Sequence, residues 1–306
     1  MSGSLSQALG LAQAMGIEAE THLIRLQRPW THLPISLHPR RLSLFECPAP
    51  PWPDLLIASA KGTIAPALAV KKAHPQTHVV YLQNPGRRHH RHFDTVIAPS
   101  HDGNLPNAIQ TLGAPHRASP ARIQAGLAAL PDTYKRLTSP IIGVLIGGNA
   151  RSHRLDATAT EHLISSLNAL ALLHKATLIF LPSRRTPKAS IEAINQAFEH
   201  TNHIVWDTDT PSPYLGILGL ADAFVITEES VSMISEAAGT GKPIHLFPLT
   251  CIRESKRMKA FHNEMIRRGF AKWFNGQLPN WSYSPLNETM RAAELLTKKI
   301  NNTTPY

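Results

Sequence analysis

The hydrophobic pattern of the second half of the chain alternates between short apolar runs and longer amphipathic stretches. Apolar runs that predict buried strands fall at residues 141–146, 177–181, 203–206, 224–227 and 244–247. Apolar spacing predicts helices between and after them at residues 158–173, 191–198, 214–220, 231–238 and 253–268. Strands this apolar, each followed by a helix, are typical of a parallel sheet with helices on both faces. We therefore expect a doubly wound α/β domain here.

The first half of the chain has a less regular pattern. Strands are predicted at residues 22–26, 54–59, 78–82 and 95–98, and helices at 5–15, 63–72 and 120–130. A proline-rich stretch at 28–53 predicts loop or edge structure. The chain opens on a polar turn and a helix, so we expect this first domain to lack the strand that normally begins a doubly wound fold.

Linker composition near residue 137 predicts the boundary between the two domains. Pro131 and the run from Thr138 to Pro140 follow the helix at 120–130. We therefore expect an N-terminal domain at 1–137, a C-terminal domain at 138–284, and a final segment at 285–306. A helix predicted at 286–300 would return from the second domain toward the first.

Composition and charge limit the partners of the chain. Its 306 residues are 42% hydrophobic and 17% charged, which is typical of a globular protein of about two domains. A net charge of +10 favours anionic partners such as nucleotides, nucleic acid or an acidic membrane surface, although it also serves solubility alone. No apolar run is long enough to span a bilayer, and the first thirty residues lack the apolar region of a signal peptide.

Cysteine usage is consistent with a reducing compartment. Only Cys47 and Cys251 occur, far apart and without metal-type spacing. We expect a cytoplasmic protein, with peripheral contact at the inner face of a membrane left open.

A glycine turn follows the first strand of the second domain. Gly147, Gly148 and Asn149 come directly after the apolar run at 141–146. Glycines at such a turn let the backbone approach a phosphate closely, and the turn offers N–H donors. The spacing does not match the dinucleotide fingerprint G-x-G-x-x-G. The alternative is a tight strand-to-helix turn without a ligand.

A basic turn follows the next strand of the same predicted sheet. Ser183, Arg184, Arg185 and Thr186 place two guanidinium groups beside two hydroxyls, an arrangement that suits phosphate oxygens. The alternative is an exposed basic loop. Because the carboxyl ends of parallel strands share one edge, we expect this turn to lie near the glycine turn.

A third polar turn lies at residues 227–232, between a strand and the helix at 231–238. Thr227, Ser230 and Ser232 offer hydroxyls at the end of a helix that favours anions. Glu236 follows six residues after Ser230 and could accept both hydroxyls of a ribose, with a surface salt bridge as the alternative. Glu228 and Glu229 belong to the same polar edge, with N-terminal capping and dipole compensation as the alternative.

His101 and Asp102 follow the strand at 95–98 of the first domain. An Asp–His pair at such an edge could deprotonate a hydroxyl, so these are our candidate catalytic residues. The alternative is a simple Asx-type turn before Gly103.

The densest run of charge in the chain lies at residues 87–92. It contains three arginines and three histidines. A metal site is disfavoured because no second ligand cluster has a defined spacing, so no metal is expected. The run is interpreted either as a loop that faces an anionic acceptor or membrane, or as a solvated loop.

Several of these motifs together resemble the mitochondrial-fission "elongated mitochondria" family. The resemblance runs from about residue 3 to about residue 295, and its segments lie at 54–59, 98–103, 143–148, 182–186, 230–243 and 261–269. The turn and helix at 230–236 are also similar, more distantly, to the donor half of the lipid-intermediate N-acetylglucosaminyltransferase of peptidoglycan synthesis. This chain differs from the family pattern at Asn84-Pro85, where Asp-Pro is common.

The resemblance implies a fold and an activity. Bacterial family members are regarded as candidate glycosyltransferases of the GT-B type, which implies two Rossmann-like domains facing each other across a cleft. The expected donor is a nucleotide-diphosphate sugar, UDP-linked by analogy, with no cofactor and no nucleic acid partner. The acceptor would be a hydroxyl on an anionic lipid- or glycan-linked molecule.

The resemblance also implies roles for the site residues. The glycine turn, the arginine pair and Ser230 would hold the diphosphate, and Glu236 would hold the ribose. A non-catalytic recruitment protein with this fold and a sugar-nucleotide epimerase are the two alternatives.

Overall fold

The chain folds into two compact units. The computed structural model describes residues 3–24, 41–45, 50–103 and 105–303. The first unit comprises Met1–Arg117 together with Asn287–Tyr306, and the second comprises Ala118–Leu286. The boundary after Arg117 precedes the one predicted near residue 137, because α3 (Pro120–Ala128) packs on α7 (Tyr214–Leu220) of the second unit.

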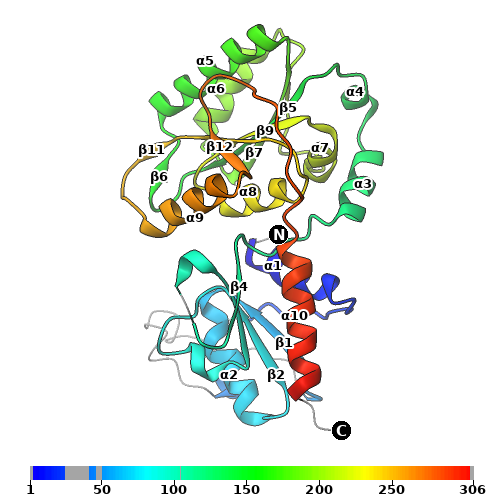
Figure 1. Ribbon diagram of the computed structural model, residues 1–306, viewed down its shortest axis with the longest axis vertical. Helices are drawn as coiled ribbons and strands as arrows, with labels where there is room; N and C mark the ends of the chain where they lie inside the picture. Colours follow the sequence, from blue (N-terminus) through cyan, green and yellow to red (C-terminus); the bar gives the residue numbers. More distant parts are fainter. Residues whose placement is uncertain (1–2, 25–40, 46–49, 104, 304–306) are drawn as a thin grey trace. The chain divides into compact units, whose positions relative to one another are not determined.

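The first unit is built around a four-stranded sheet. Its strands lie in the order β1 (Leu55–Ser59), β2 (His78–Leu82), β3 (Thr95–Pro99) and β4 (Ala108–Thr111), and every neighbouring pair is parallel (Figure 1). β2 and β3 are almost wholly buried, as their apolar sequences predict. The strands predicted at 54–59, 78–82 and 95–98 are therefore confirmed, whereas β4 was not predicted.

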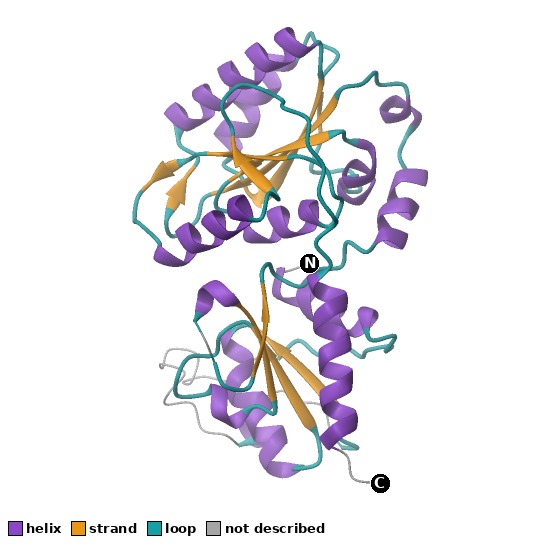
Figure 2. Cartoon of the chain, viewed as in Figure 1, coloured by secondary structure: helices purple, strands orange, loops and turns teal. Residues whose placement is uncertain are grey.

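Helices cover both faces of this sheet. Successive side chains of a strand point to opposite faces, and in β2 and β3 the side chains on both faces are buried. Val79 and Tyr81 of β2 pack on α2 (Ile64–Ala73). Val80 and Leu82 pack on the other face, in a cluster with residues of α1 (Gly3–Ala14) and α10 (Glu288–Thr303). Figure 2 shows these helices against the orange strands of the sheet.

Hydrogen bonds attach the C-terminal helix α10 to the first unit. The Glu288 carboxylate accepts the N–H of Leu112 at 2.6 Å, and the Thr289 hydroxyl accepts the N–H of His116 at 2.9 Å. Both acceptors lie in the first turn of α10 and are buried. The predicted helix at 286–300 thus exists, and it completes the core of the unit that begins the chain.

The second unit contains a six-stranded parallel sheet in the order β12-β10-β9-β5-β7-β8. The strands are β5 (Ile141–Gly148), β7 (Thr177–Arg185), β8 (Ile204–Val205), β9 (Ala223–Thr227), β10 (Ile244–Phe247) and β12 (Ala271–Trp273). β5, β9 and β10 are fully buried. All five strands predicted for this half are confirmed, and β12 is an additional edge strand.

Helices again lie on both faces of this sheet. Leucines of α5 (Ala157–His174) and apolar residues of α6 (Lys188–Phe198) join β5 and β7 in one core cluster. The helices α7 and α8 (Val231–Ala238) contact β5, β9 and β10 instead. The remaining helices of the unit are α3, α4 (Asp132–Lys135) and α9 (Lys256–Arg267).

Two local predictions need correction. The helix predicted from residue 158 begins at Ala157, because the Asp156 side chain caps it by accepting the N–H of Ala159 at 2.9 Å. The strand predicted at 22–26 is absent from residues 22–24, and residues 25–26 lie outside the described part. A small antiparallel pair, β6 (His153–Arg154) with β11 (Thr250–Cys251), was not predicted.

No helix in the described ranges is both long enough and apolar enough to span a membrane. Cys251 is exposed and forms no disulfide, whereas Cys47 falls outside the described residues.

Candidate functional site

The sheet of the second unit changes its direction of winding between β5 and β9. From β5 the chain proceeds outward through β7 and β8, and it then returns to the other side of β5 for β9, β10 and β12. In open α/β sheets, ligands bind at the carboxyl ends of the strands beside such a switch point. The three predicted polar turns begin within the last residues of β5, β7 and β9, so they share this edge. We call these turns the rim.

The turn at the end of β5 requires glycine at position 148, whereas at position 147 a side chain would have to displace the Glu229 carboxylate. A Cβ on Gly147 would overlap Oε1 of Glu229, and a Cβ on Gly148 would overlap the carbonyl group of Arg185. Gly148 also has φ of +108°, which L-residues with a side chain rarely adopt. The N–H of Gly147 donates to the Thr227 hydroxyl at 2.8 Å. Both glycines are buried, so the turn is tightly packed.

The turn after β7 is bonded to the end of β5. The Ser183 hydroxyl donates to the Gly147 carbonyl, and the buried Thr186 hydroxyl donates to that of Ile146 at 3.0 Å. The N–H of Asn149 donates to the Arg185 carbonyl at 3.1 Å. Arg184 and Arg185 remain exposed at the end of this turn. The predicted proximity of the two turns is confirmed.

The turn after β9 leads into the N-terminus of α8. Ser230 is buried at the N-cap position, yet its side chain makes no capping hydrogen bond. Ser232 is half-buried in the first turn of the helix. Because the first N–H groups of a helix have no intrahelical partners, this end is suited to an anion.

Glu236, the predicted ribose ligand, is half-buried within α8. Its Oε2 accepts the hydroxyl of Tyr214 from α7 at 2.6 Å. Burial raises the pKa of Glu236 to about 7, and the Tyr214 bond opposes part of this rise. The same burial raises the pKa of Tyr214 well above its ordinary value. Glu236 therefore has a hydroxyl partner already, rather than the surface salt bridge considered as the alternative.

Glu229 lies inside the rim, between the glycine turn and the arginine pair. Its side chain is wholly buried, and Arg185 Nη2 lies 3.6 Å from Oε1. Neither carboxylate oxygen makes a hydrogen bond of good geometry with a described residue. Burial raises the pKa of Glu229 to about 7, and Thr227, Arg185 and nearby N–H groups lower it only in part. Glu229 therefore does not cap α8, and it lies on the polar edge to which the sequence assigns it.

Glu228 has a structural role on the opposite side of the same turn. Its Oε1 accepts the N–H of Leu249 at 2.9 Å. His153 Nε2 lies 3.6 Å from Oε1, and His262 Nδ1 lies 3.8 Å from Oε2. Burial lowers the pKa of His262, which favours the neutral ring. Glu228 thus connects β6 and α9 to the end of β9 and does not cap α8.

The candidate catalytic pair belongs to the first unit. His101 and Asp102 lie in the single turn η6 (Ser100–Asp102) that follows β3. His101 Nε2 lies 3.6 Å from Asp102 Oδ1, and both side chains are largely buried. The Asn84 side chain donates to the Asp102 carbonyl at 2.7 Å, which fixes the turn. The two side chains adjoin at a distance longer than a hydrogen bond, and their catalytic role stays a prediction.

The basic run forms a turn near the same end of the first unit's sheet. Arg87, Arg88 and Arg91 are exposed, with η5 (His90–His92) inside the run. Asn84 accepts the N–H of Gly86 at 2.8 Å, so one side chain connects this turn to η6. Among the described residues, no cluster of His, Cys, Asp or Glu side chains is arranged to hold a metal ion.

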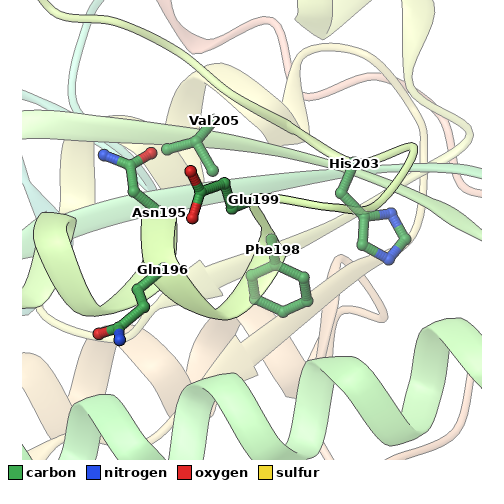
Figure 3. A pocket seen from close by; sticks show the side chains of 6 residues that line it. All are labelled: Asn195, Gln196, Phe198, Glu199, His203 and Val205. Atoms are coloured by element: carbon green, nitrogen blue, oxygen red, sulfur yellow. The ribbon is translucent and has the colours of Figure 1, made fainter.

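A shallow depression of about 500 Å³ lies elsewhere on the second unit (Figure 3). It is lined by the end of α6 and the start of β8, including Phe198, Glu199 and His203. Because α6 precedes β8, these residues lie near the amino ends of the strands, away from the rim. None of the predicted site residues lines this depression.

Two residues of the site were missed as ligands or partners. Glu229 lies next to Ser230 in the sequence. Its role in the site depends on contacts with Gly147 and Arg185 that only folding creates. Tyr214 ends a proline-rich loop, and no local pattern pairs it with Glu236. An acidic pair directly after a buried strand at a switch point is the signal that could have drawn attention to Glu229.

Comparison with known proteins identifies the family. A model of the mitochondrial fission ELM1 family matches residues 2–300. The mitochondrial fission protein ELM1 of Arabidopsis thaliana is 30% identical over 278 residues, covering 81% of this chain and 64% of that protein. An uncharacterized protein of Rickettsia prowazekii is 26% identical over 290 residues, covering 81% of each chain. The present chain thus spans less than two thirds of the Arabidopsis relative.

Solved structures identify the fold. A UDP-GlcNAc 2-epimerase from Neisseria meningitidis, bound to UDP-GlcNAc, has a TM-score of 0.54 at 12% identity, over 82% of this chain and 76% of that chain. At this identity the likeness concerns architecture alone. The GT-B-like fold class with two Rossmann-like units is therefore confirmed. Because the family model matches nearly the whole chain, the chain belongs to the mitochondrial fission ELM1 family.

Proposed function

We propose that the chain is a glycosyltransferase that moves a sugar from a nucleotide-diphosphate sugar to a hydroxyl of a lipid- or glycan-linked acceptor. One observation carries this proposal. The glycine turn, the arginine pair, the N-terminus of α8 and Glu236 all belong to the carboxyl edge and neighbouring helix beside the switch point of one sheet. Phosphate and ribose groups need this combination of amides, guanidinium groups and a carboxylate.

The donor-binding roles follow from the chemistry of each group. The Asn149 side chain, Arg184 and Arg185, with the N–H of Gly148 and the first N–H groups of α8, would hold the diphosphate, aided by the hydroxyls of Thr227, Ser230 and Ser232. The N–H groups of Gly147 and Asn149 already donate within the rim. The positive charge of Arg184 and Arg185 would stabilise the leaving diphosphate without a metal ion. Glu236 would accept the ribose hydroxyls in place of the Tyr214 hydroxyl. The UDP-GlcNAc in the Neisseria epimerase suggests uracil as the base of the donor.

Acceptor activation is assigned to the first unit. Asp102 or His101 would take the proton of the acceptor hydroxyl as the new glycosidic bond forms and the nucleotide diphosphate leaves. The exposed Arg87, Arg88 and Arg91 would bind an anionic group of the acceptor or of the membrane that carries it. A cytoplasmic protein with peripheral contact at an inner membrane face fits this assignment.

Two other functions have support of their own. The likeness to an epimerase makes conversion of the donor sugar itself a second candidate. The name of the Arabidopsis relative suggests a recruitment protein that retains the fold without catalysis. Product analysis of UDP-GlcNAc incubated without an acceptor separates the first alternative, since an epimerase would change the sugar.

The donor site can be tested by calorimetric titration of UDP-GlcNAc. We expect Glu236→Ala to weaken binding by about 10- to 100-fold, because hydrogen bonds to a charged group contribute about 1.5–3 kcal/mol. Tyr214→Phe is the matched control, since it keeps the carboxylate and removes only its present partner. Its affinity should equal or exceed that of the wild type. Correctly folded wild-type protein that binds no uridine nucleotide would end the enzyme proposal.

The basic run can be tested with vesicles. Replacing Arg87, Arg88 and Arg91 by glutamine should weaken sedimentation with phosphatidylserine vesicles at least tenfold, since each arginine near an anionic surface contributes about 1 kcal/mol. Binding of UDP-GlcNAc should not change, because the rim belongs to the other unit. Unchanged vesicle binding would remove the membrane from the proposal.

A further inference from the structure

We propose that Glu229 couples donor binding to protonation: the rim takes up one proton from solvent onto this carboxylate when a nucleotide-diphosphate sugar binds. The inference rests on the proposed donor site and adds its regulation by pH. Glu229 is the positioning residue in this scheme, since it acts on the anion through Arg185 and the glycine turn.

The position of Glu229 carries the first step. Its Oε1 lies so close to Gly147 that a Cβ there would overlap it, and it lies 3.6 Å from Arg185 Nη2. Ser230, which follows it, occupies the N-cap position of α8, whose N-terminus would receive the diphosphate. The carboxylate is therefore enclosed among the same groups that would bind the anion.

The charge balance around Glu229 carries the second step. Arg185 from β7 is the charged group that faces it, and the β5 turn and the start of α8 contribute only uncharged groups. Its neighbour Glu228 turns instead to Leu249, His153 and His262. An ionised Glu229 thus forms an ion pair with Arg185, and its negative charge repels a bound diphosphate. This repulsion between like charges is strong where water is excluded.

Protonation relieves both effects. The neutral carboxyl no longer attracts Arg185, which is then available to phosphate oxygens, and its O–H can donate a hydrogen bond. Burial already raises the pKa of Glu229 to about 7 in the ligand-free protein. A nearby diphosphate would raise it further, so binding and protonation favour each other.

The test is the pH dependence of donor affinity. UDP-GlcNAc is the probe because its pyrophosphate diester keeps the same charge between pH 6 and 8.5. We expect wild-type affinity to fall about tenfold over this range, since linkage to one proton allows at most tenfold per pH unit. Glu229→Gln, which keeps shape and removes ionisation, should bind at pH 8.5 about as well as the wild type at pH 6.

A second measurement counts the proton directly. Calorimetry at pH 7.5 in two buffers with different ionisation enthalpies should show greater proton uptake by the wild type than by Glu229→Gln, because Glu236 titrates equally in both proteins. Equal pH slopes and equal proton uptake in the two proteins would overturn the inference while leaving the donor site intact. Wild type that binds no UDP-GlcNAc at any pH would overturn the proposed function and this inference together.

Discussion

Gly148→Ala is expected to destabilise the second unit by about 3 kcal/mol or more and to abolish donor binding. The new Cβ would overlap the carbonyl oxygen and carbon of Arg185, and these are backbone atoms that cannot rotate away. The residue would also be held at φ of +108°, which costs a non-glycine residue about 1–3 kcal/mol. Relief of the overlap would need the β5 and β7 turns to separate, which would break the bond from Asn149 to Arg185.

Gly276→Ala is the matched control for this prediction. Gly276 lies in the same unit at φ of +80°, but nothing lies within 4 Å of the position of its Cβ. It therefore carries the backbone strain without the overlap, and we expect a loss of about 1 kcal/mol. Urea unfolding of both variants, followed by hydrogen exchange in peptides from β9 and β10, separates the two contributions. Equal losses would mean that the close approach of the two turns contributes nothing.

Lowering the pH from 7 to 4 is expected to remove about 3 kcal/mol of stability through His245 alone. This residue is buried in β10, its ring meets Phe274 and Trp281 edge-on, and neither ring nitrogen has a hydrogen-bond partner among the described residues. Burial lowers the pKa of His245 from 6.5 to about 4, and the positive charge of Lys272 adds to this lowering. A shift of this size corresponds to about 3 kcal/mol at about 1.4 kcal/mol for each pH unit.

The sign follows from proton binding in the two states. The folded pKa lies below the unfolded pKa, so the unfolded chain takes up the proton first as the pH falls. Stability from the neutral ring is therefore complete above pH 6.5 and is lost progressively toward pH 4.

His245→Leu tests this contribution. The variant removes the titrating ring together with two buried polar atoms that lack partners, so it should be at least as stable as the wild type at pH 7. Its loss of stability between pH 7 and 4 should be smaller by about 3 kcal/mol. His78, His203 and His262, whose pKa values burial also lowers, remain in both proteins and cancel in the difference. Parallel pH profiles of the two proteins would contradict the prediction.

The sequence by itself determined the strand and helix order of the second unit. Its strands are buried on both faces, so each appears as an unbroken apolar run, and polar or proline-rich segments mark where it ends. Parallel strands share their carboxyl edge, so the sequence alone predicts that the turns at 147–149, 183–186 and 227–232 lie together. The short strands β4, β6, β11 and β12 escaped prediction because so few residues carry little periodicity.

Tertiary structure alone decided which residues contact one another along that edge. The boundary between the two units lies after Arg117 rather than near residue 137, because α3 packs on α7, about ninety residues further along the chain. Glu229 became a buried carboxylate against Gly147 and Arg185, and Glu236 gained Tyr214. Local patterns report the burial of a segment, whereas the pKa of a buried carboxylate depends on which distant atoms exclude water from it. That is why the position of the rim followed from the chain, and its proton chemistry only from the fold.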